Sequence, residues 1–199
     1  MRKIAFTLAV TLLLSACAGV SSDYKFDPKK TDGLILGSIT YDSSIGQYSL
    51  IFISQASATP QLASVGYSMW PPLGPLHDDL LNAKGGTFAL AVPAGEYRIV
   101  GWQITQGYKI TRNSVPISIP FTVAQGKSSY LGNLHFDEDW ENIQLRDKAE
   151  RDLPVLQSRV NILKTTPIEF GIEKSLVLKK FGGEYSSRYK TPIFIPIVR

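Results

Sequence analysis

Short apolar segments, separated by clusters of Gly, Pro, Asn and Ser, dominate the sequence between residues 33 and 136. In segments 87–92 and 117–124, large apolar residues alternate with small or polar ones. A period of two places every second side chain on one face of a strand, and no sustained helical period appears before residue 147. The pattern predicts a mainly β protein, and we expect an antiparallel β-sandwich.

Two pairs of neighbouring segments are predicted to form β-hairpins. Segments 33–41 and 47–54 flank a short polar turn, whereas 87–92 and 96–105 flank a Pro-Ala-Gly-Glu turn. In the second turn proline presets φ and glycine permits a positive φ. Further strands are predicted at 62–69, 117–124 and 128–136. The prolines near segment 117–124 make it an edge strand, because they cannot donate to a ladder.

Segment 96–105 is predicted to be a strand that is apolar on both faces. Tyr97 and Ile99 would lie on one face, and Val100, Trp102 and Ile104 on the other. The outer face of a two-layer β protein is normally polar. We therefore expect this outer face to be covered, either by the C-terminal helix and segment or by a partner protein.

The sequence changes character after residue 147. Apolar residues at helical spacing predict one helix over 153–163, with Asp152 as its N-cap and Pro154 in its first turn. These apolar residues are Leu153, Leu156, Val160 and Leu163. The charged residues before the helix are interpreted as a solvated face. Its expected ion pairs are Asp147–Arg151 and Lys148–Asp152.

Composition narrows the class of protein. With 199 residues, of which 44% are apolar and 19% charged, the chain can bury a core and does not resemble a disordered one. Its single Cys excludes an intramolecular disulfide framework and a cysteine-rich zinc module, so we expect no cofactor and no metal. No block of five like charges occurs, so we expect no nucleic-acid partner.

The N-terminus has the organisation of a secretory signal. Arg2 and Lys3 form a positive start, and the apolar region 4–14 is too short to span a bilayer. The signal ends in Leu14-Ser15-Ala16-Cys17, which resembles the lipobox of bacterial lipoproteins. The resemblance implies cleavage before Cys17 and lipidation of its thiol.

Lipidation would divide the N-terminal part into a signal, 1–16, and a polar lipidated tether, 17–32. Two or three acyl chains would anchor the protein in a membrane permanently, whereas a single chain binds only marginally. Ala18 rather than Asp follows Cys17. By resemblance to the usual sorting rule of lipoproteins, this favours the outer membrane.

A second resemblance concerns the fold. Residues 86–99 resemble a hairpin of transthyretin-like and carboxypeptidase-regulatory-like β-sandwiches. Residues 121–134 are similar to the following part of uncharacterised bacterial lipoproteins built on that plan. The resemblance implies a prealbumin-like sandwich over 33–146, on which a helix and C-terminal segment, 147–199, would pack. Such domains commonly bind partners, sugars or membranes, and the fold does not choose among these.

Two stretches place histidine beside carboxylates. His77-Asp78-Asp79, at the end of a proline-rich loop, is a candidate for a metal ligand or a base, although adjacent Asp residues more often form turns or helix caps. The second stretch, 135–142, has the alternating carboxylates of a calcium loop. It lacks the Gly and Glu of an EF-hand, because Asn142 and Lys148 occupy those positions. Its other interpretations are a solvated acidic loop or a glycosidase pair among Glu138, Asp139 and Glu141.

Aromatic residues provide a further candidate site. Trp70 and Trp140 lie in predicted loops and are the candidates for ligand contact by stacking on a sugar. The strand residues Tyr41, Tyr48 and Trp102 are expected to fill the core.

Three functions remain open. The sequence contains no G-x-S-x-G, H-E-x-x-H, P-loop or G-x-G-x-x-G motif, so we predict that the protein is not an enzyme. The first hypothesis is a lipid-anchored, non-enzymatic binding or assembly accessory protein with an envelope protein partner. The second is a carbohydrate or peptidoglycan binder that uses Trp70 and Trp140. The third is a hydrolase that uses His77 or His135 with nearby carboxylates.

Overall fold

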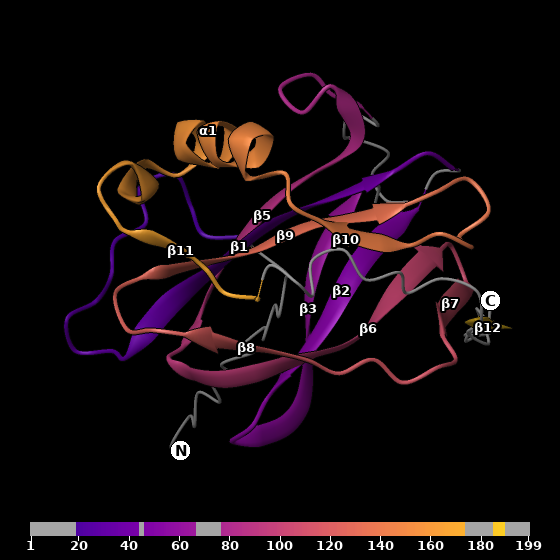
Figure 1. Cartoon of the computed structure of the whole chain (residues 1–199), viewed down its shortest axis with the longest axis horizontal. Helices are drawn as coiled ribbons and strands as arrows, with labels where there is room; N and C mark the ends of the chain where they lie inside the picture. The colour runs from indigo at the N-terminus through magenta and orange to yellow at the C-terminus, as the bar shows by residue number, and fades with distance from the viewer. Residues whose placement is uncertain (1–18, 44–45, 67–76, 174–184, 190–199) are drawn as a thin grey trace, which may run out of the picture.

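The computed structural model describes residues 19–43, 46–66, 77–173 and 185–189, and its described part is mainly β, as the sequence predicts (Figure 1). The strands are β1 Asp32–Tyr41, β2 Gln47–Ser54, β3 Ser57–Gly66, β4 His77–Asp78, β5 Ala83–Pro93, β6 Gly95–Gln106, β7 Lys109–Asn113, β8 Ile119–Val123, β9 Ser128–Phe136, β10 Gln144–Arg146, β11 Ile168–Phe170 and β12 Tyr185–Tyr189. The helix α1 spans Ala149–Arg159, and a 3₁₀ helix follows at Asn161–Lys164.

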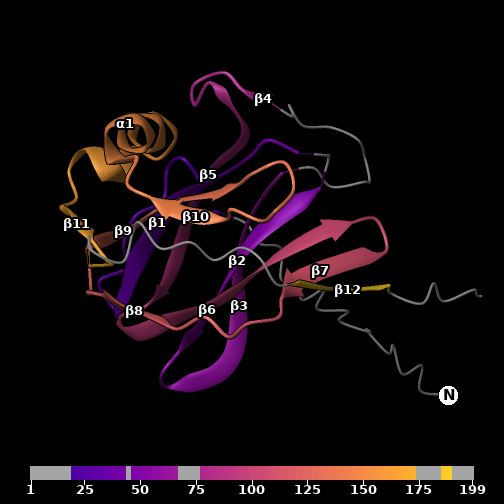
Figure 2. The same cartoon turned by 45° about the vertical axis from the view of Figure 1, so that its right-hand side comes forward.

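The described strands form two sheets. The first has the order β10-β9-β1-β5-β4, with β11 also beside β9; the second has the order β12-β7-β6-β2-β3, with β8 also beside β6. The largest buried cluster contains residues of both sheets, including Ile35 and Ile39 of β1 and Phe52 of β2. The main core therefore lies between the sheets. Figure 2 shows them as two layers, with α1 on the far side of the first.

Both predicted hairpins are wrong. β1 pairs with β5 and β9, whereas β2 pairs with β3 and β6 in the other sheet. Likewise β5 pairs with β1 and β4, whereas β6 pairs with β2, β7 and β8. The turns after β1 and β5 carry the chain from one sheet to the other. Alternation indicates only that one face of a strand is buried, and two strands can meet that condition by facing each other across the core as well as by pairing.

The prediction of antiparallel pairing holds for most neighbours but not for all. β1 and β9 are parallel from Leu34 opposite Ser128 to Tyr41 opposite Phe136, and β11 also runs parallel to β9. Parallel neighbours need a long connection between them. Here the connection from β1 to β9 contains strands of the second sheet, so the first sheet is mixed.

Strand β6 is not apolar on two faces, because it contains a β-bulge. Opposite Ile51 and Phe52 of β2, it has one extra residue, Val100. The extra residue reverses the alternation, so the apolar side chains on either side of it enter the same core. These are Tyr97, Ile99, Trp102 and Ile104. The expected cover by the helix is wrong as well, because α1 packs against the first sheet and not against β6.

The predicted helix is present with shifted ends. α1 begins four residues before the predicted start, and Lys148 takes the N-cap position. Asp152, the predicted N-cap, lies inside the helix and is buried, as its backbone N–H donates to Lys148 O at 2.8 Å. α1 packs on the outer face of the first sheet, where it forms a second apolar cluster, called here the helix-side cluster. Its buried members are Leu34, Leu36, Ala89, Tyr130, Leu156, Val160 and Leu163.

Residues 19–31, part of the expected tether, are in contact with the β body. The N–H of Val20 donates to Ala89 O at 2.8 Å, and Ser22 O accepts from the N–H of Asn161 at 3.0 Å. Val20, Tyr24 and Phe26 pack against the helix-side cluster. The expected signal, 1–16, and Cys17 lie outside the described residues. Within the described part, no helix has the length and apolar character needed to cross a membrane.

Candidate functional site

The outer face of the first sheet changes from apolar to polar along β1 and β9. Beneath α1, this face presents Leu34, Leu36 and Tyr130, which are fully buried in the helix-side cluster. Beyond them lies a set of polar side chains, called here the polar row. Its members are Ser38 and Thr40 of β1 and Asn133 and His135 of β9.

A β-bulge at Gly132 determines the direction of the polar row on β9. Between Leu36 and Ser38, β1 advances two residues while β9 advances three. Gly132 has a φ of +103°, a conformation that favours glycine, and a Cβ there would lie 2.8 Å from the carbonyl oxygen of Arg146. Without the extra residue, the polar side chains that follow on β9 would point into the main core.

A buried carboxylate joins α1 to the polar row. Asp152 is 0% exposed, and its Oδ2 accepts from Ser38 Oγ at 2.6 Å and from Tyr130 Oη at 2.7 Å. Its Oδ1 accepts from Arg151 Nε at 2.8 Å, and Arg151 Nη2 also donates to Ser38 Oγ at 3.2 Å. Burial, reinforced by the charge of Asp152, raises the pKa of the Tyr130 hydroxyl. The hydroxyl therefore stays protonated and donates a hydrogen bond to Asp152. The buried charge is thus fully hydrogen-bonded.

The hydrogen bonds continue from Ser38 to the rim of the sheet. Asn133 Nδ2 donates to Ser38 Oγ at 2.8 Å and to Thr40 Oγ1 at 3.1 Å. Thr40 Oγ1 lies 2.9 Å from His135 Nδ1, and His135 Nε2 lies 3.2 Å from Asp42 Oδ2. A carboxylate only accepts, so in a neutral imidazole Nε2 carries the proton and Nδ1 accepts from the Thr40 hydroxyl.

His135 is neutral near pH 7. Burial and the charge of Arg146 lower the pKa of this imidazole below its ordinary value of 6.5, while Asp42 opposes them only in part. The neutral form is the one that fits the hydrogen bonds just described.

We expect the protein to lose stability as the pH falls below 6.5, and His135 to account for part of the loss. Because its pKa is lowered by folding, the unfolded chain takes up the proton first, and stability rises with pH between the two pKa values. Urea unfolding between about pH 7.5 and pH 5 measures this slope. His135→Gln should flatten this slope. Equal slopes in the wild type and His135→Gln would contradict the assignment.

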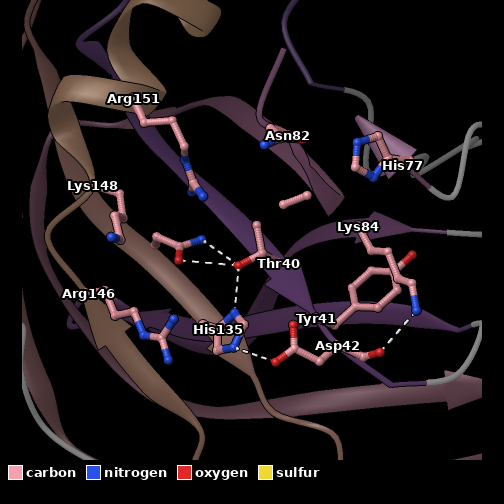
Figure 3. Close-up of a pocket in the computed structure, with 12 residues that line it drawn as sticks. Thr40, Tyr41, Asp42, His77, Asn82, Lys84, His135, Arg146, Lys148 and Arg151 are labelled. Atoms are coloured by element: carbon pink, nitrogen blue, oxygen red, sulfur yellow. Dashed lines mark hydrogen bonds and ion pairs between the residues drawn. The ribbon is translucent and has the colours of Figure 1, made fainter. Parts of the chain in front are cut away.

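Thr40, Asn133 and His135 of the polar row lie in the floor of a pocket with a volume of about 410 Å³ (Figure 3). This size suits a small ligand or one group of a larger one. Arg146, Lys148 and Arg151 approach it from one side, and Lys84 with His77 from the other, as Figure 3 shows. The lining therefore contains four cationic side chains and, in Asp42, one carboxylate.

Thr40, His135 and Asp42 have the order of a nucleophile, a base and a carboxylate that orients the base. This arrangement meets the basic requirement of the hydrolase hypothesis, a histidine within hydrogen-bond reach of a carboxylate. Thr40, however, is 2% exposed, and its hydroxyl oxygen also accepts from Asn133. A substrate has little access to that oxygen, so the geometry favours a structural hydrogen-bond chain over a reactive triad.

The predicted His77-Asp78-Asp79 stretch is divided between different environments. His77 lines the pocket, and its Nε2 lies 3.9 Å from Asp79 Oδ1, whose side chain is 98% exposed. Asp78 accepts from Arg159 Nη2 at 2.8 Å and 2.7 Å, one bond to each carboxylate oxygen. This ion pair connects β4 to α1, which is a structural role.

The predicted acidic loop, 135–142, is closed by a hydrogen bond from the N–H of Asn142 to Asp137 Oδ2 at 2.9 Å. Glu138, Asp139 and Glu141 are exposed. In the described ranges, no group of three or more His, Cys, Asp or Glu side chains is arranged to hold a metal ion.

Of the two tryptophans predicted to contact a ligand, Trp70 lies outside the described residues, as does most of the proline-rich loop. Trp140 donates from Nε1 to Ser43 Oγ at 2.8 Å and packs edge-on against Tyr185 at 5.7 Å. Lys109 Nζ lies 5.9 Å from the centroid of its ring. These contacts occupy part of the surface that a sugar would need.

The cations of the pocket were not predicted as a site. The expected solvated face is present in part, because Asp147, Lys148 and Glu150 are exposed. The expected pairs Asp147–Arg151 and Lys148–Asp152 are replaced by one between Arg151 and the adjacent Asp152, at 2.8 Å. The signal available in the sequence was the polar alternation at one end of β1, where Ser38 and Thr40 follow Leu34 and Leu36 on the same face.

Comparisons with known proteins add little. No family model matches the sequence, and no curated protein sequence matches it. A solved structure of a leucine-rich repeat protein from Bacteroides thetaiotaomicron VPI-5482 aligns with 57% of this chain and 13% of its own, at 15% identity and a TM-score of 0.33. A similarity of that size carries no argument about fold or function.

Proposed function

We propose that this protein is a lipid-anchored, non-enzymatic binding protein of the bacterial cell envelope. It is attached to the outer membrane through acyl chains at Cys17 and binds another envelope component in the pocket above the polar row. Its β domain is a transthyretin-like β-sandwich, a proposal supported by the two sheets and the core that they share.

The observation that carries the binding role is the construction of the pocket. Its floor is a sheet face whose side chains are held by hydrogen bonds to one another, from Asp152 to Asp42. Such a floor presents a fixed shape to a ligand, which lowers the entropic cost of binding. The inaccessible hydroxyl of Thr40 supports a binding role over catalysis.

The contacts of the N-terminal segment support display close to the membrane. Val20 already hydrogen-bonds to β5, and two residues separate it from the proposed lipid attachment site, Cys17. An extended chain of that length spans at most about 11 Å. A lipid at Cys17 would therefore hold the β domain against the membrane surface rather than at the end of a long tether.

Site-specific photocrosslinking in the native envelope tests the proposal. A photoreactive residue replacing Lys84, at the rim of the pocket, should give one discrete adduct. The same residue replacing Tyr108, which is 61% exposed in the turn between β6 and β7, is the control and should not give that adduct. Cys17→Ala should abolish both acylation and the adduct. Identical adducts from both positions, or none from Lys84, would contradict the binding role.

A further inference from the structure

We infer that the pocket binds a phosphoryl group, held by Arg146, Lys148 and Arg151 above the polar row. The inference rests on the proposed binding function and specifies the chemistry of its ligand. Three observations support it: the excess of cations in the lining, the arginine nitrogens that have no hydrogen-bond acceptor among the described residues, and the position of the Asp42 carboxylate.

The residues that line the pocket carry more positive than negative charge. Arg146 donates to the neutral amide oxygen of Gln144 at 3.0 Å, and Lys84 Nζ donates to the backbone oxygen of Asp42 at 3.0 Å. In the described part of the chain, Lys84, Arg146 and Lys148 take part in none of the ion pairs, and only Arg151 has a carboxylate partner. Unneutralised cations around a concave surface concentrate an anion there.

The cations are also oriented. Asp152 and Ser38 hold Arg151 through its Nε and Nη2, which leaves Nη1 without a hydrogen bond to any described residue. Arg146 is held through Nε alone, so neither Nη1 nor Nη2 has a hydrogen bond to a described residue. Figure 3 shows the ends of both side chains on the same side of the pocket. Guanidinium groups fixed in this way suit an anion with several oxygens.

The number of cations favours a phosphoryl group over a carboxylate. A single carboxylate carries one charge and two oxygens, which one arginine fork already satisfies. A phosphate monoester carries close to two charges and three terminal oxygens. It matches two guanidinium groups and the ammonium of Lys148, which is a point charge with three donors.

The position of the Asp42 carboxylate indicates where in the pocket the anion binds. Its carboxylate is 60% exposed and bonds to His135, on the side away from Lys148 and Arg151. Repulsion from this carboxylate disfavours an anion near His135. The phosphoryl group therefore lies nearer Arg146, Lys148 and Arg151. The same phosphoryl chemistry belongs to soluble phosphate esters and to lipid headgroups, and the experiment distinguishes these sources.

The test is a nuclear magnetic resonance titration of the full-length, acylated protein in a neutral detergent at constant ionic strength. The readout is the Nε–H signals of Arg146 and Arg151, with Arg98 of the second sheet as an internal control. Inorganic phosphate should shift the first two signals saturably, and acetate should need at least tenfold higher concentrations. A soluble short-chain phosphatidic acid, whose headgroup is a phosphate monoester, that binds more tightly than phosphate assigns the site to headgroups, and weaker binding assigns it to free phosphate esters.

Variants make the test specific. Lys148→Gln, at an exposed position, and Arg146→Gln should each weaken phosphate binding at least tenfold, as measured at Arg151. Arg98→Gln, which removes a cation of β6 bonded to Ser118, should leave it unchanged. No saturable shift, equal binding of acetate, or an equal loss in Arg98→Gln would overturn the inference.

The two proposals fail separately. If phosphate does not bind while the residue at Lys84 still gives its adduct in the envelope, the phosphoryl inference is wrong and the binding function stands. If phosphate binds but no adduct forms, the pocket chemistry stands and the envelope role is wrong.

Discussion

Replacing Asp152 with Ala is expected to lower the free energy of unfolding by about 3–5 kcal/mol, a large share of the stability of a domain of this size. The carboxylate is fully buried and accepts from Ser38, Tyr130 and Arg151 at 2.6–2.8 Å. Its removal leaves two buried hydroxyls and part of a guanidinium without their acceptor. Arg151 can turn towards water, because its side chain is 29% exposed, so we expect a value near the lower end.

Urea unfolding of the variant, with its midpoint and slope compared with those of the wild type, measures this loss. Glu150→Ala, two residues away on the exposed face of α1, is the matched control and should cost less than about 1 kcal/mol. Asp152→Asn keeps an acceptor for the hydroxyls and should fall between the two. If Asp152→Ala and Glu150→Ala were equally stable, the buried carboxylate would have no structural role.

Local pattern was enough to predict the mainly β class and several strand positions. Segment 128–136 coincides with β9, and Ile119, Phe121 and Val123 of β8 are buried in alternation, as expected. The partners of the strands were not predictable in the same way. Neither hairpin forms, because two strands with one apolar face each can bury those faces by packing against each other across the core instead of pairing side by side. The bulge at Val100 has no signal in the order of apolar residues.

The site was less predictable than the fold. His77 and His135 were both singled out, and the structure places both beside one pocket. Arg146, Lys148 and Arg151 are close together in the sequence, between the end of β10 and the first turn of α1, whereas Lys84 comes from β5. Nothing in the local pattern indicates that these four cations meet around one pocket. Asp152 is a clear case: at the start of a predicted helix a carboxylate indicates an N-cap, and only the neighbouring strands reveal it as a buried acceptor.

Gly132→Ala is the second change expected to have a large effect, and it acts on the fold and on the pocket together. At a φ of +103° an alanine is strained by about 1–3 kcal/mol, and its Cβ would lie 2.8 Å from the carbonyl oxygen of Arg146. That oxygen belongs to β10, which must shift or lose its pairing with β9. We expect a total loss of about 2–4 kcal/mol, measured by urea unfolding.

Gly126→Ala separates the two causes of that loss. Gly126 also has a positive φ, +68°, but a Cβ there meets nothing within 4 Å, so only the backbone strain of about 1 kcal/mol applies. A loss in Gly132→Ala that is no larger than in Gly126→Ala would show that β10 accommodates the methyl group freely. Movement of β10 also displaces Arg146, so Gly132→Ala should weaken phosphate binding where Gly126→Ala does not. The bulge would then be the feature that connects the architecture of the first sheet to the chemistry of its pocket, because one added residue in β9 both turns the polar row outward and positions the cation that stands over it.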